Sequence, residues 1–245
     1  MRRLDGKIAI VTGASKGIGA AIGKQLAAEG AAVVVNFASS DTDAAAVVST
    51  IEQAGGRAVA IKGDVSNAGD ADAIIKAALD TYGRLDILVN NAGKYEFAAL
   101  ADITEEHFHK LFNINVLGLL LVTRAAAAKM GDGASIINIG ASITTMNPPA
   151  SAVYGASKSA AETITRVLSK ELGSRGIRIN SVNPGPTETE GTVHLRGGSA
   201  GGGPIKRTPL GRIGQPQDIA KIVVFLASEE SGWMTGDVLI ASGGL

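Results

Sequence analysis

The fold of this chain is decided by the stretch Thr12-Gly13-Ala14-Ser15-Lys16-Gly17-Ile18-Gly19, which separates an apolar run from a helical pattern. Its glycines follow the spacing Gly-x-x-x-Gly-x-Gly. Glycines at a strand-to-helix turn let the backbone bend tightly and approach a phosphate, which the helix N-terminus stabilises. Glycine triplets also occur as plain turns, but so early in the chain and in this context the pattern favours nucleotide binding.

Outward from this stretch, short β-rich runs alternate with longer helical patterns. The runs are dominated by Val, Ile or Leu without strict polar alternation, as expected of strands that are covered on both faces. Alternating strands and helices predict right-handed crossovers and therefore a doubly wound, parallel α/β sheet. The expected strands are Lys7–Thr12, Ala32–Phe37, Ala58–Lys62, Leu85–Val89, Ser135–Gly140, Ile177–Val182 and Val238–Ile240.

The helical patterns between the runs supply the layers that cover the sheet. In the first of them, Ile18, Ile22 and Leu26 form an i, i+4 stripe that packs on the strands. No repeat and no linker divides the chain, so we predict one domain over residues 1–245. The expected helices include Gly17–Glu29, Asp43–Ala54, Asp70–Tyr82 and a long one within Ser151–Arg175.

One irregular stretch, residues 185–209, is rich in Gly, Pro and Thr and follows the sixth expected strand. Loops of this length are usually functional or disordered. Ligands bind beyond the carboxyl ends of the strands in doubly wound sheets, which is where this loop begins. We therefore predict a mobile lid that sets the substrate range, with a plain surface loop as the alternative.

The composition excludes several classes of function. The 245 residues include 23 Lys plus Arg and 23 Asp plus Glu, so the chain has no general attraction for nucleic acid or anionic membranes. The absence of cysteine excludes disulfides, thiol nucleophiles and thiolate metal sites, and fits an intracellular, cytoplasmic location. No stretch approaches the roughly 20 apolar residues needed to span a bilayer, and the apolar run after Met1-Arg2-Arg3 is too short for a signal peptide.

The histidines show no ligand pattern, so no metal site is predicted. His107 and His109 are two residues apart and point to opposite faces of a helix, which favours a solvated surface for both. His194 stands alone in the irregular stretch.

The second expected strand ends in Val35-Asn36-Phe37-Ala38-Ser39-Ser40, with no acid before Asp41. A site specific for NAD(H) normally places an acid here to accept bonds from the adenosine ribose. A carboxylate would repel a 2′-phosphate, whereas Asn36, Ser39 and Ser40 can donate to it and Lys16 can supply a cation. NADP(H) is therefore favoured over NAD(H). The alternative is a polar loop beside a solvated lysine.

Two further segments follow strand ends on the cofactor side. In Gly63-Asp64-Val65, Asp64 is placed to accept a bond from adenine. The small residues of Asn90-Asn91-Ala92-Gly93 suit close approach of the chain to the adenosine ribose, although such a segment alone would pass as a turn. Its position beside the topological switch of the sheet favours binding.

Tyr154 and Lys158 lie early in the long helix, and their i, i+4 spacing places them on one face. A free tyrosine has a pKa of about 10, too high for efficient proton exchange at neutral pH. An ammonium about 4 Å away, at an effective dielectric of about 20, favours the phenolate by roughly 4 kcal/mol. The pair therefore predicts a tyrosine with a lowered pKa that acts as a general acid or base.

Together these residues resemble the short-chain dehydrogenase/reductase family over essentially the whole chain, including ketoreductases of the 3-oxoacyl-[acyl-carrier-protein] type and relatives of glucose dehydrogenase. The glycine motif, Asp64, Asn90–Gly93, Asn115, Tyr154 with Lys158, and Asn183-Pro184-Gly185 occur in the order and spacing of the family. The resemblance implies a single-domain Rossmann fold with a seven-stranded sheet, a small-molecule carbonyl or alcohol substrate, and a homotetramer.

The resemblance also implies roles for individual residues. Tyr154 is expected to donate a proton to the carbonyl oxygen, and Lys158 to lower its pKa and bind the nicotinamide ribose. Asn115 matches the residue that holds a water of the proton relay. Within Pro184–Thr189, the segment that caps the nicotinamide, Thr187 is expected to bond through its backbone and Thr189 through its hydroxyl. The predicted cofactor-binding residues are Gly13, Ser15, Lys16, Gly17, Ile18, Gly19, Asn36, Ser39, Ser40, Asp64, Val65, Asn91, Ala92, Gly93, Tyr154, Lys158, Pro184, Gly185, Thr187 and Thr189.

One departure from the family pattern affects the catalytic set. Members usually carry a serine 13 residues before the tyrosine, where this chain has Ala141. Ser142 follows it, and because loops tolerate shifts in length we expect Ser142 to polarise the carbonyl. Thr144 or Thr145 is the alternative. A second departure, Ala241-Ser242-Gly243-Gly244 in place of the frequent Asp-Gly-Gly ending, is interpreted as structural.

The leading hypothesis is an NADPH-dependent reductase of ketones. A sugar or polyol dehydrogenase that works oxidatively would use the same site, as would a 3-oxoacyl reductase acting on acyl carrier protein, although Lys129–Ala134 is less basic than an acidic partner favours. A weakly catalytic NADP-binding regulatory protein is the distant alternative. Asn115, Tyr154 and Lys158 argue against it, since a protein that only binds would not need that acid–base geometry.

Overall fold

The computed structural model describes residues 2–190 and 207–245 and contains one seven-stranded sheet in the order β3-β2-β1-β4-β5-β6-β7. Every neighbouring pair of strands is parallel. The predicted α/β fold is thereby confirmed, and the expected strand ends differ from the observed ones by at most two residues. The strands are β1 (Ile8–Val11), β2 (Ala32–Phe37), β3 (Arg57–Lys62), β4 (Ile87–Asn90), β5 (Ser135–Ile139), β6 (Arg178–Pro184) and β7 (Val238–Ala241).

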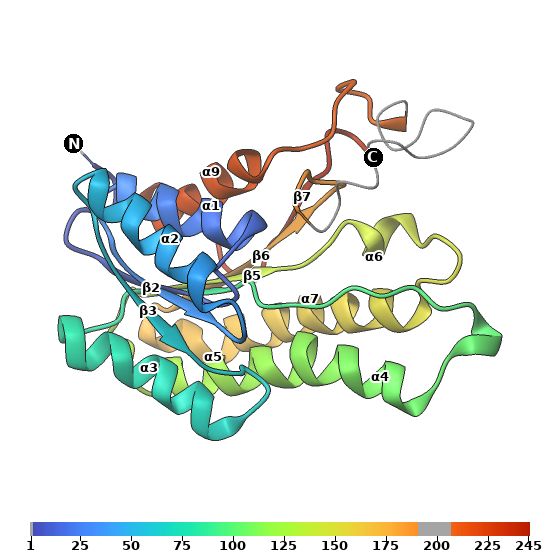
Figure 1. Cartoon of the computed structure of the whole chain (residues 1–245), viewed down its shortest axis with the longest axis horizontal. Helices are drawn as coiled ribbons and strands as arrows, with labels where there is room; N and C mark the ends of the chain where they lie inside the picture. The colour runs from blue at the N-terminus through green and yellow to red at the C-terminus, as the bar shows by residue number, and fades with distance from the viewer. Residues whose placement is uncertain (1, 191–206) are drawn as a thin grey trace.

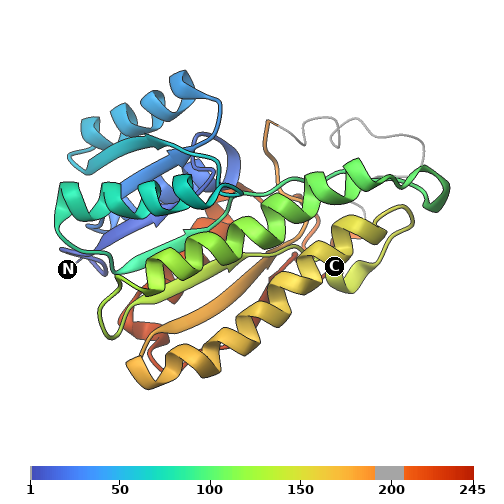
Figure 2. The ribbon, with the colours of Figure 1, turned by 90° about the horizontal axis from the view of Figure 1, so that it is seen from below.

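Helices cover both faces of the sheet (Figures 1 and 2). Successive residues of a strand point to opposite faces, so Ala9 and Val11 pack under one layer and Ile8 and Ile10 under the other. Because helices cover both faces of the sheet, the central strands have continuous apolar sequences. One layer is α1 (Gly17–Ala28), α2 (Asp41–Gln53) and α9 (Pro216–Ala227); the other is α3 (Ala68–Tyr82), α5 (Leu119–Ala127) and α7 (Ala152–Leu172).

A continuous helix runs from Glu105 to Ala127 and comprises α4 (Glu105–Phe112), the π-helical turn η2 (Asn113–Gly118) and α5. Among the described residues it is long and apolar enough, by length and composition alone, to cross a membrane. It nevertheless contains no unbroken run of about 20 apolar residues, because two asparagines and an arginine interrupt its apolar part, which agrees with the expectation from sequence. In the fold this helix packs against α3, α7 and β4, which accounts for much of its apolar surface.

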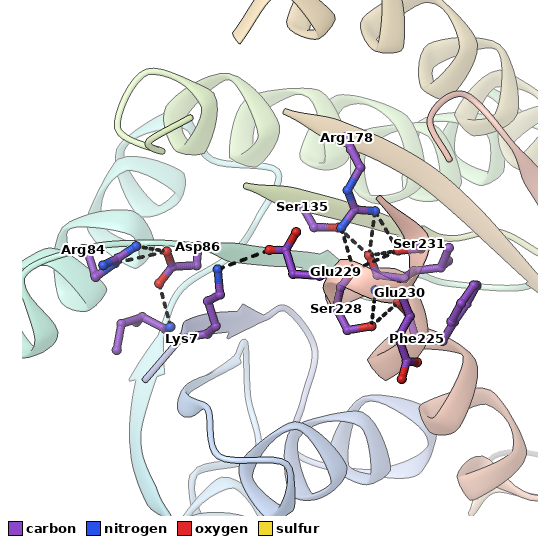
Figure 3. Close-up of polar contacts among 12 residues, drawn as sticks. Lys7, Arg84, Asp86, Ser135, Arg178, Phe225, Ser228, Glu229, Glu230 and Ser231 are labelled. Carbon is purple, nitrogen blue, oxygen red and sulfur yellow. Dashed lines mark hydrogen bonds and ion pairs between the residues drawn. The ribbon is translucent and has the colours of Figure 1, made fainter. Parts of the chain in front are cut away.

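Polar contacts close the edge of the sheet at the amino ends of the strands (Figure 3). The Asp86 carboxylate accepts a 2.9 Å hydrogen bond from the Ile8 N–H and is paired with Arg84. The guanidinium of Arg178 donates to the Leu226 carbonyl at 2.9 Å and to Ser231 Oγ at 2.8 Å. These contacts connect the strands to η5 (Glu229–Ser231) at the amino-end edge of the sheet. Ligands bind at the opposite edge of such sheets, at the carboxyl ends of the strands.

The structure bears on the expectations for the histidines and for the lid. His107 was expected on the solvated surface, but its side chain is on the buried side of α4. Neither ring nitrogen has a hydrogen-bond partner among the described residues. His109 is exposed as expected. Most of the lid predicted over residues 185–209 falls on 191–206, outside the described residues, and His194 lies there too. Within the described part of the chain, no group of three His, Asp or Glu side chains could hold a metal ion.

Candidate active site

Two adjoining clefts of about 590 and 570 Å³ open at the carboxyl ends of the strands. The first lies over β1, β2, β3 and β4, and the second over β5, β6 and the start of α7. They share lining residues and therefore adjoin each other. The shared lining residues are Ile18, Asn91, Gly93, Lys94, Tyr95 and Thr189.

The first cleft is built on the glycine turn. Gly13 has a φ of +60°, and a Cβ there would lie 2.9 Å from the Ala92 Cα, so only glycine fits between β1 and the segment after β4. At the N-terminus of α1, Lys16 makes no side-chain cap and the first turn carries no acidic residue. The free backbone N–H groups of the first turn of α1 therefore suit an anion such as a pyrophosphate. The predicted residues Ser15, Gly17 and Gly19 line this cleft as well.

The start of α1 contributes Lys16 to the same cleft, and the segment after β2 contributes Ser39 and Ser40. Lys16 and Ser39 are exposed. Asn36 also lines the cleft, but its contacts differ from the predicted ones. Its amide donates to the carbonyls of Ile61 and Gly63, and its Oδ1 accepts from the Gly13 N–H. Both amide protons are thus used by β3 and the turn after it. Asn36 braces the glycine turn, and the donors available for a 2′-phosphate are Lys16 and the two serines.

The residues predicted to bind the adenosine part of the cofactor line the first cleft, and their binding roles stay predictions. Asp64 and the buried Val65 line the first cleft, and the Asp64 carboxylate accepts from the backbone N–H and the hydroxyl of Ser66. The amide of Asn91 donates 2.9 Å hydrogen bonds to the carbonyls of Thr12 and Gly13. Asn91 therefore holds the end of β4 against the glycine turn, which positions Ala92 and Gly93.

Tyr154 and Lys158 occupy the first two turns of α7 and line the second cleft together. Lys158 is buried, and its Nζ donates a 2.9 Å hydrogen bond to the Ile139 carbonyl at the end of β5. No carboxylate pairs with it among the described residues. Burial therefore lowers the pKa of Lys158 to about 8.

The pKa of Tyr154 departs from the sequence expectation. Burial raises it to about 12, and the nearby phenol of Tyr95 acts in the same direction. The expectation of a pKa lowered by Lys158 considered the attraction of one neighbouring charge and omitted the cost of removing a phenolate from water. Desolvation dominates the pKa of Tyr154, and the phenol is held in its protonated form.

Asn115 lies in the π-helical turn η2 and is buried. Its Oδ1 accepts a 2.8 Å hydrogen bond from the Lys94 N–H, while its amide donates to the Lys94 carbonyl and to Ser157 Oγ, each at 2.9 Å. The side chain thus connects the segment after β4 to α7, three residues from Tyr154. π-Helical turns interrupt the regular backbone ladder and often occur at functional sites. The water-holding role stays a prediction.

Ala141 and Ser142 both line the second cleft, just before the short helix α6 (Ile143–Met146). Ser142 is buried, with its N–H donating to the Pro184 carbonyl at 2.8 Å and its hydroxyl 3.5 Å from Met146 Sδ. Sulfur is a weak acceptor, so this hydroxyl is easily redirected to a ligand. The hydroxyls of Thr144 and Thr145 donate to the backbone carbonyls of Ala141 and Ser142.

The segment after β6 forms one wall of the second cleft. Pro184, Gly185, Thr187 and Thr189 line it, as the resemblance implies for a nicotinamide site. Thr187 is buried, and its hydroxyl donates to the Gly185 carbonyl at 2.9 Å. The Gly185 N–H donates to the Ala241 carbonyl, so the unusual C-terminal segment supports this wall, in line with a structural role.

Sequence reasoning missed several residues that line the second cleft. Tyr95 and Phe97 follow directly after Asn90–Gly93, and Ile143 and Met146 come from α6. The available signal was two aromatic residues within three positions, in a chain with only three tyrosines and five phenylalanines.

Comparisons with known proteins cover the whole of this architecture. The family model described as enoyl-(acyl carrier protein) reductase matches residues 13–245. An uncharacterized oxidoreductase of Methylorubrum extorquens is 53% identical over all of both chains. A probable tetrahydroxynaphthalene reductase of Zymoseptoria tritici is 39% identical over 97% of this chain and 93% of its own. A short chain dehydrogenase from Burkholderia cenocepacia, solved in complex with NADP, superposes with a TM-score of 0.92 at 36% identity, over 99% of this chain and 98% of its own.

Proposed function

The chain belongs to the short-chain dehydrogenase/reductase family of oxidoreductases, and from that premise we propose that it is an NADP(H)-dependent reductase of ketones that also oxidises the corresponding alcohols. The observation that carries this proposal is the placement of Tyr154 and Lys158. Both line an apolar cleft that adjoins the nucleotide cleft. A proton donor is thereby placed beside the position where a nicotinamide would meet a carbonyl carbon.

The residues present fit NADP(H), which supplies the hydride when it is bound. The uncapped N-terminus of α1 suits the pyrophosphate, and Lys16 with Ser39 and Ser40 suits a 2′-phosphate. No acid stands at the end of β2 before Asp41, where a ribose 2′-hydroxyl would otherwise be recognised. The NADP complex of the Burkholderia relative supports the same cofactor.

The proton reaches the substrate from Tyr154. Because its pKa is about 12 in the chain alone, the phenol holds its proton at neutral pH and can give it to the carbonyl oxygen as hydride adds to the carbonyl carbon. The products of this step are an alcohol and a phenolate. The Lys158 ammonium, one helical turn away, stabilises the phenolate as it forms, because opposite charges attract strongly in a buried site. In the oxidative direction the phenolate takes the proton back.

We assign the orientation of the carbonyl to Ser142. Ser142 lines the cleft, and among the described residues the Met146 thioether is the one hydrogen-bond partner of its hydroxyl. We propose that Asn115, which hydrogen-bonds to Lys94 and Ser157, holds a water molecule through which Tyr154 is reprotonated.

The lining of the second cleft favours a ketone with apolar substituents over a sugar or polyol, since Ile143, Met146 and Phe97 offer no hydrogen bonds to hydroxyl groups. A second candidate function is reduction of a 3-oxoacyl group carried by acyl carrier protein; the description of the matching family model, an enoyl-(acyl carrier protein) reductase, names the same carrier but a different reducible bond. Acetoacetyl thioesters and sugars in one substrate panel separate these candidates.

We also propose that the chain works as a homotetramer. Leu117, Leu120 and Val167 are each more than one-third exposed and lie on η2, α5 and α7, which are neighbours in one layer. Exposed apolar side chains on neighbouring helices favour association. Light scattering at several concentrations would measure the mass, and a mass that stays at one or two chains would contradict the tetramer.

The function is tested by initial rates of NADPH oxidation over the panel, with Tyr154→Phe as the decisive variant. Loss of the proton donor should lower kcat by about 10²–10⁴-fold, while NADPH binding, measured by calorimetry, stays within error. Tyr82→Phe is the matched control, since Tyr82 lies on α3 outside both clefts. A Tyr154→Phe enzyme with most of its kcat would refute the assignment.

A further inference from the structure

The mouth of the second cleft is crossed by residues 94–98, here called the aromatic rim. Tyr95 and Phe97 of this segment line the cleft, yet 48% and 51% of their surface is exposed. Their ring centroids lie 6.4 and 5.9 Å from that of Tyr154, with the rings inclined at 58° and 68°. Two large apolar surfaces therefore stand partly in water beside the proton donor.

The aromatic rim is held at both ends although it has no regular secondary structure. At Lys94, the backbone N–H and carbonyl are both hydrogen-bonded by the Asn115 side chain, at 2.8 and 2.9 Å. At Ala98, the N–H donates a 2.9 Å hydrogen bond to the Ala150 carbonyl, just before α7. Ordered ends reduce the entropy that the segment loses when a ligand binds.

Between these anchors, the side chains point in alternate directions. Glu96 forms an ion pair with Lys110 on α4, whereas Tyr95 and Phe97 contact Tyr154. Alternation of this kind is the property of an extended segment. The two aromatic rings are consequently directed into the cleft together.

The chemistry around the rings is apolar. Ile143, Met146 and Pro148 line the same cleft, and among its described lining residues only Lys94 and Lys158 carry charge. Aromatic rings prefer partners that meet them edge to face or in offset stacks, and methionine sulfur also packs well against rings. A flat unsaturated ring would satisfy both preferences and remove the exposed aromatic surface from water.

We propose that Tyr95 and Phe97 are specificity-determining residues that select ketones whose carbonyl belongs to a flat, unsaturated ring system. This inference rests on the proposed reductase function and adds the substrate class. The rings touch the part of the substrate that does not react, so they act on binding and orientation, while Tyr154 supplies the proton.

The test compares two ketones with the same fused bicyclic skeleton: β-tetralone, which has one aromatic ring, and β-decalone, which is fully saturated. In both ketones the carbonyl is not conjugated with the second ring. The intrinsic reactivity of the carbonyl is therefore similar, and the shape of the ring system is the main difference. The wild-type kcat/KM with NADPH should favour β-tetralone by about tenfold, as expected when one or two aromatic pairs form. A ratio near one would overturn the proposal.

Variants assign that preference to the rings. Phe97→Leu and Tyr95→Leu should each lower the ratio several-fold, mainly by raising KM for β-tetralone, whereas Tyr95→Phe should keep it. Phe108→Leu is the matched control, because Phe108 is a comparably exposed phenylalanine on α4 that does not line the cleft. Ratios that stay at the wild-type value in both leucine variants would also overturn the proposal.

Binding of β-naphthol to the NADP⁺-loaded chain, followed by calorimetry, separates this inference from the proposed function. If neither ketone is reduced but β-naphthol binds several-fold more weakly to Phe97→Leu, the reductase function fails and the aromatic selectivity stands. If both ketones are reduced equally and β-naphthol binds all variants alike, the function stands and the selectivity fails.

Discussion

The Nζ of Lys158 donates a 2.9 Å hydrogen bond to the backbone carbonyl of Ile139, so the end of β5 holds the ammonium at the base of the second cleft. A carbonyl is a dipole and not a full countercharge. The ammonium is therefore buried at a net cost, which is seen in a pKa lowered from 10.5 to about 8.

This cost predicts an unusual dependence of stability on pH. Between pH 8 and 10.5 the unfolded chain keeps the Lys158 proton and the folded chain loses it, so stability rises with pH in that window. Relative to Lys158→Met, the unfolding free energy of the cofactor-free wild type should rise by roughly 2 kcal/mol between about pH 7 and pH 10. Urea denaturation at both pH values measures it.

Lys170→Met is the control for that experiment, since Lys170 is an exposed lysine on the same helix. Tyr154 acts in the opposite sense, because its raised pKa makes stability fall between pH 10 and about 12. The comparison therefore stops at pH 10. Equal pH dependence in wild type and Lys158→Met would show that the ammonium is not buried at a cost.

Cofactor choice should depend on Lys16. Lys16→Ala is expected to lower kcat/KM for NADPH by about tenfold or more, because it removes a charge-assisted contact with the 2′-phosphate. The value for NADH should change little. Lys24→Ala, an exposed lysine further along α1 and outside the cleft, should leave both unchanged. Equal losses for the two cofactors in Lys16→Ala would argue against contact with the phosphate.

The displaced serine can be tested by moving it. Ser142→Ala should raise the barrier of the chemical step by about 3 kcal/mol, as for loss of a donor to a developing oxyanion. The double variant Ala141→Ser with Ser142→Ala should recover part of that rate, because both positions line the cleft. If Ser142→Ala is harmless, a threonine of α6 or a bound water polarises the carbonyl instead.

Gly140 should tolerate no side chain. A Cβ there would lie 1.9 Å from Asn183 Oδ1, and Asn183 is hydrogen-bonded to Ser181, Glu162 and Thr144. We expect Gly140→Ala to lower the unfolding free energy by about 2 kcal/mol or more, since it disrupts a buried polar network. Gly131→Ala is the control, because nothing lies within 4 Å of its Cβ.

The origin of that loss can be checked by a double-mutant cycle. Asn183→Ala removes the atom that clashes, so Gly140→Ala combined with Asn183→Ala should be more stable than the sum of the single losses. Strict additivity would mean that the damage arises elsewhere.

Much of the fold could be predicted because two features of the sequence, the apolar strand runs and the motifs at the ends of strands, are local. Continuous Val and Ile runs such as Ala32–Phe37 indicate doubly covered strands, and each motif of the site directly follows a strand or begins a helix. Parallel strands bring their carboxyl ends to one edge, so residues as distant in sequence as Gly13 and Tyr154 come to adjoining clefts.

What could not be predicted depends on packing between elements. Asn36 pairs with Ile61 across β2 and β3, and this register commits its amide to backbone carbonyls. His107 is buried on α4, a helix that packs against α7, and its local sequence does not indicate this packing. The pKa of Tyr154 likewise depends on burial and on Tyr95, which comes from a different segment.

The anchors of the aromatic rim have a consequence for how this enzyme can change. Both anchors bind main-chain atoms, at Lys94 and Ala98, so they hold whatever side chains stand at positions 95 and 97. Two point mutations could then exchange one family of substrates for another while the proton donor, the cofactor cleft and the sheet stay as they are. The molecule separates the part that evolution or an engineer can vary from the part that performs the chemistry.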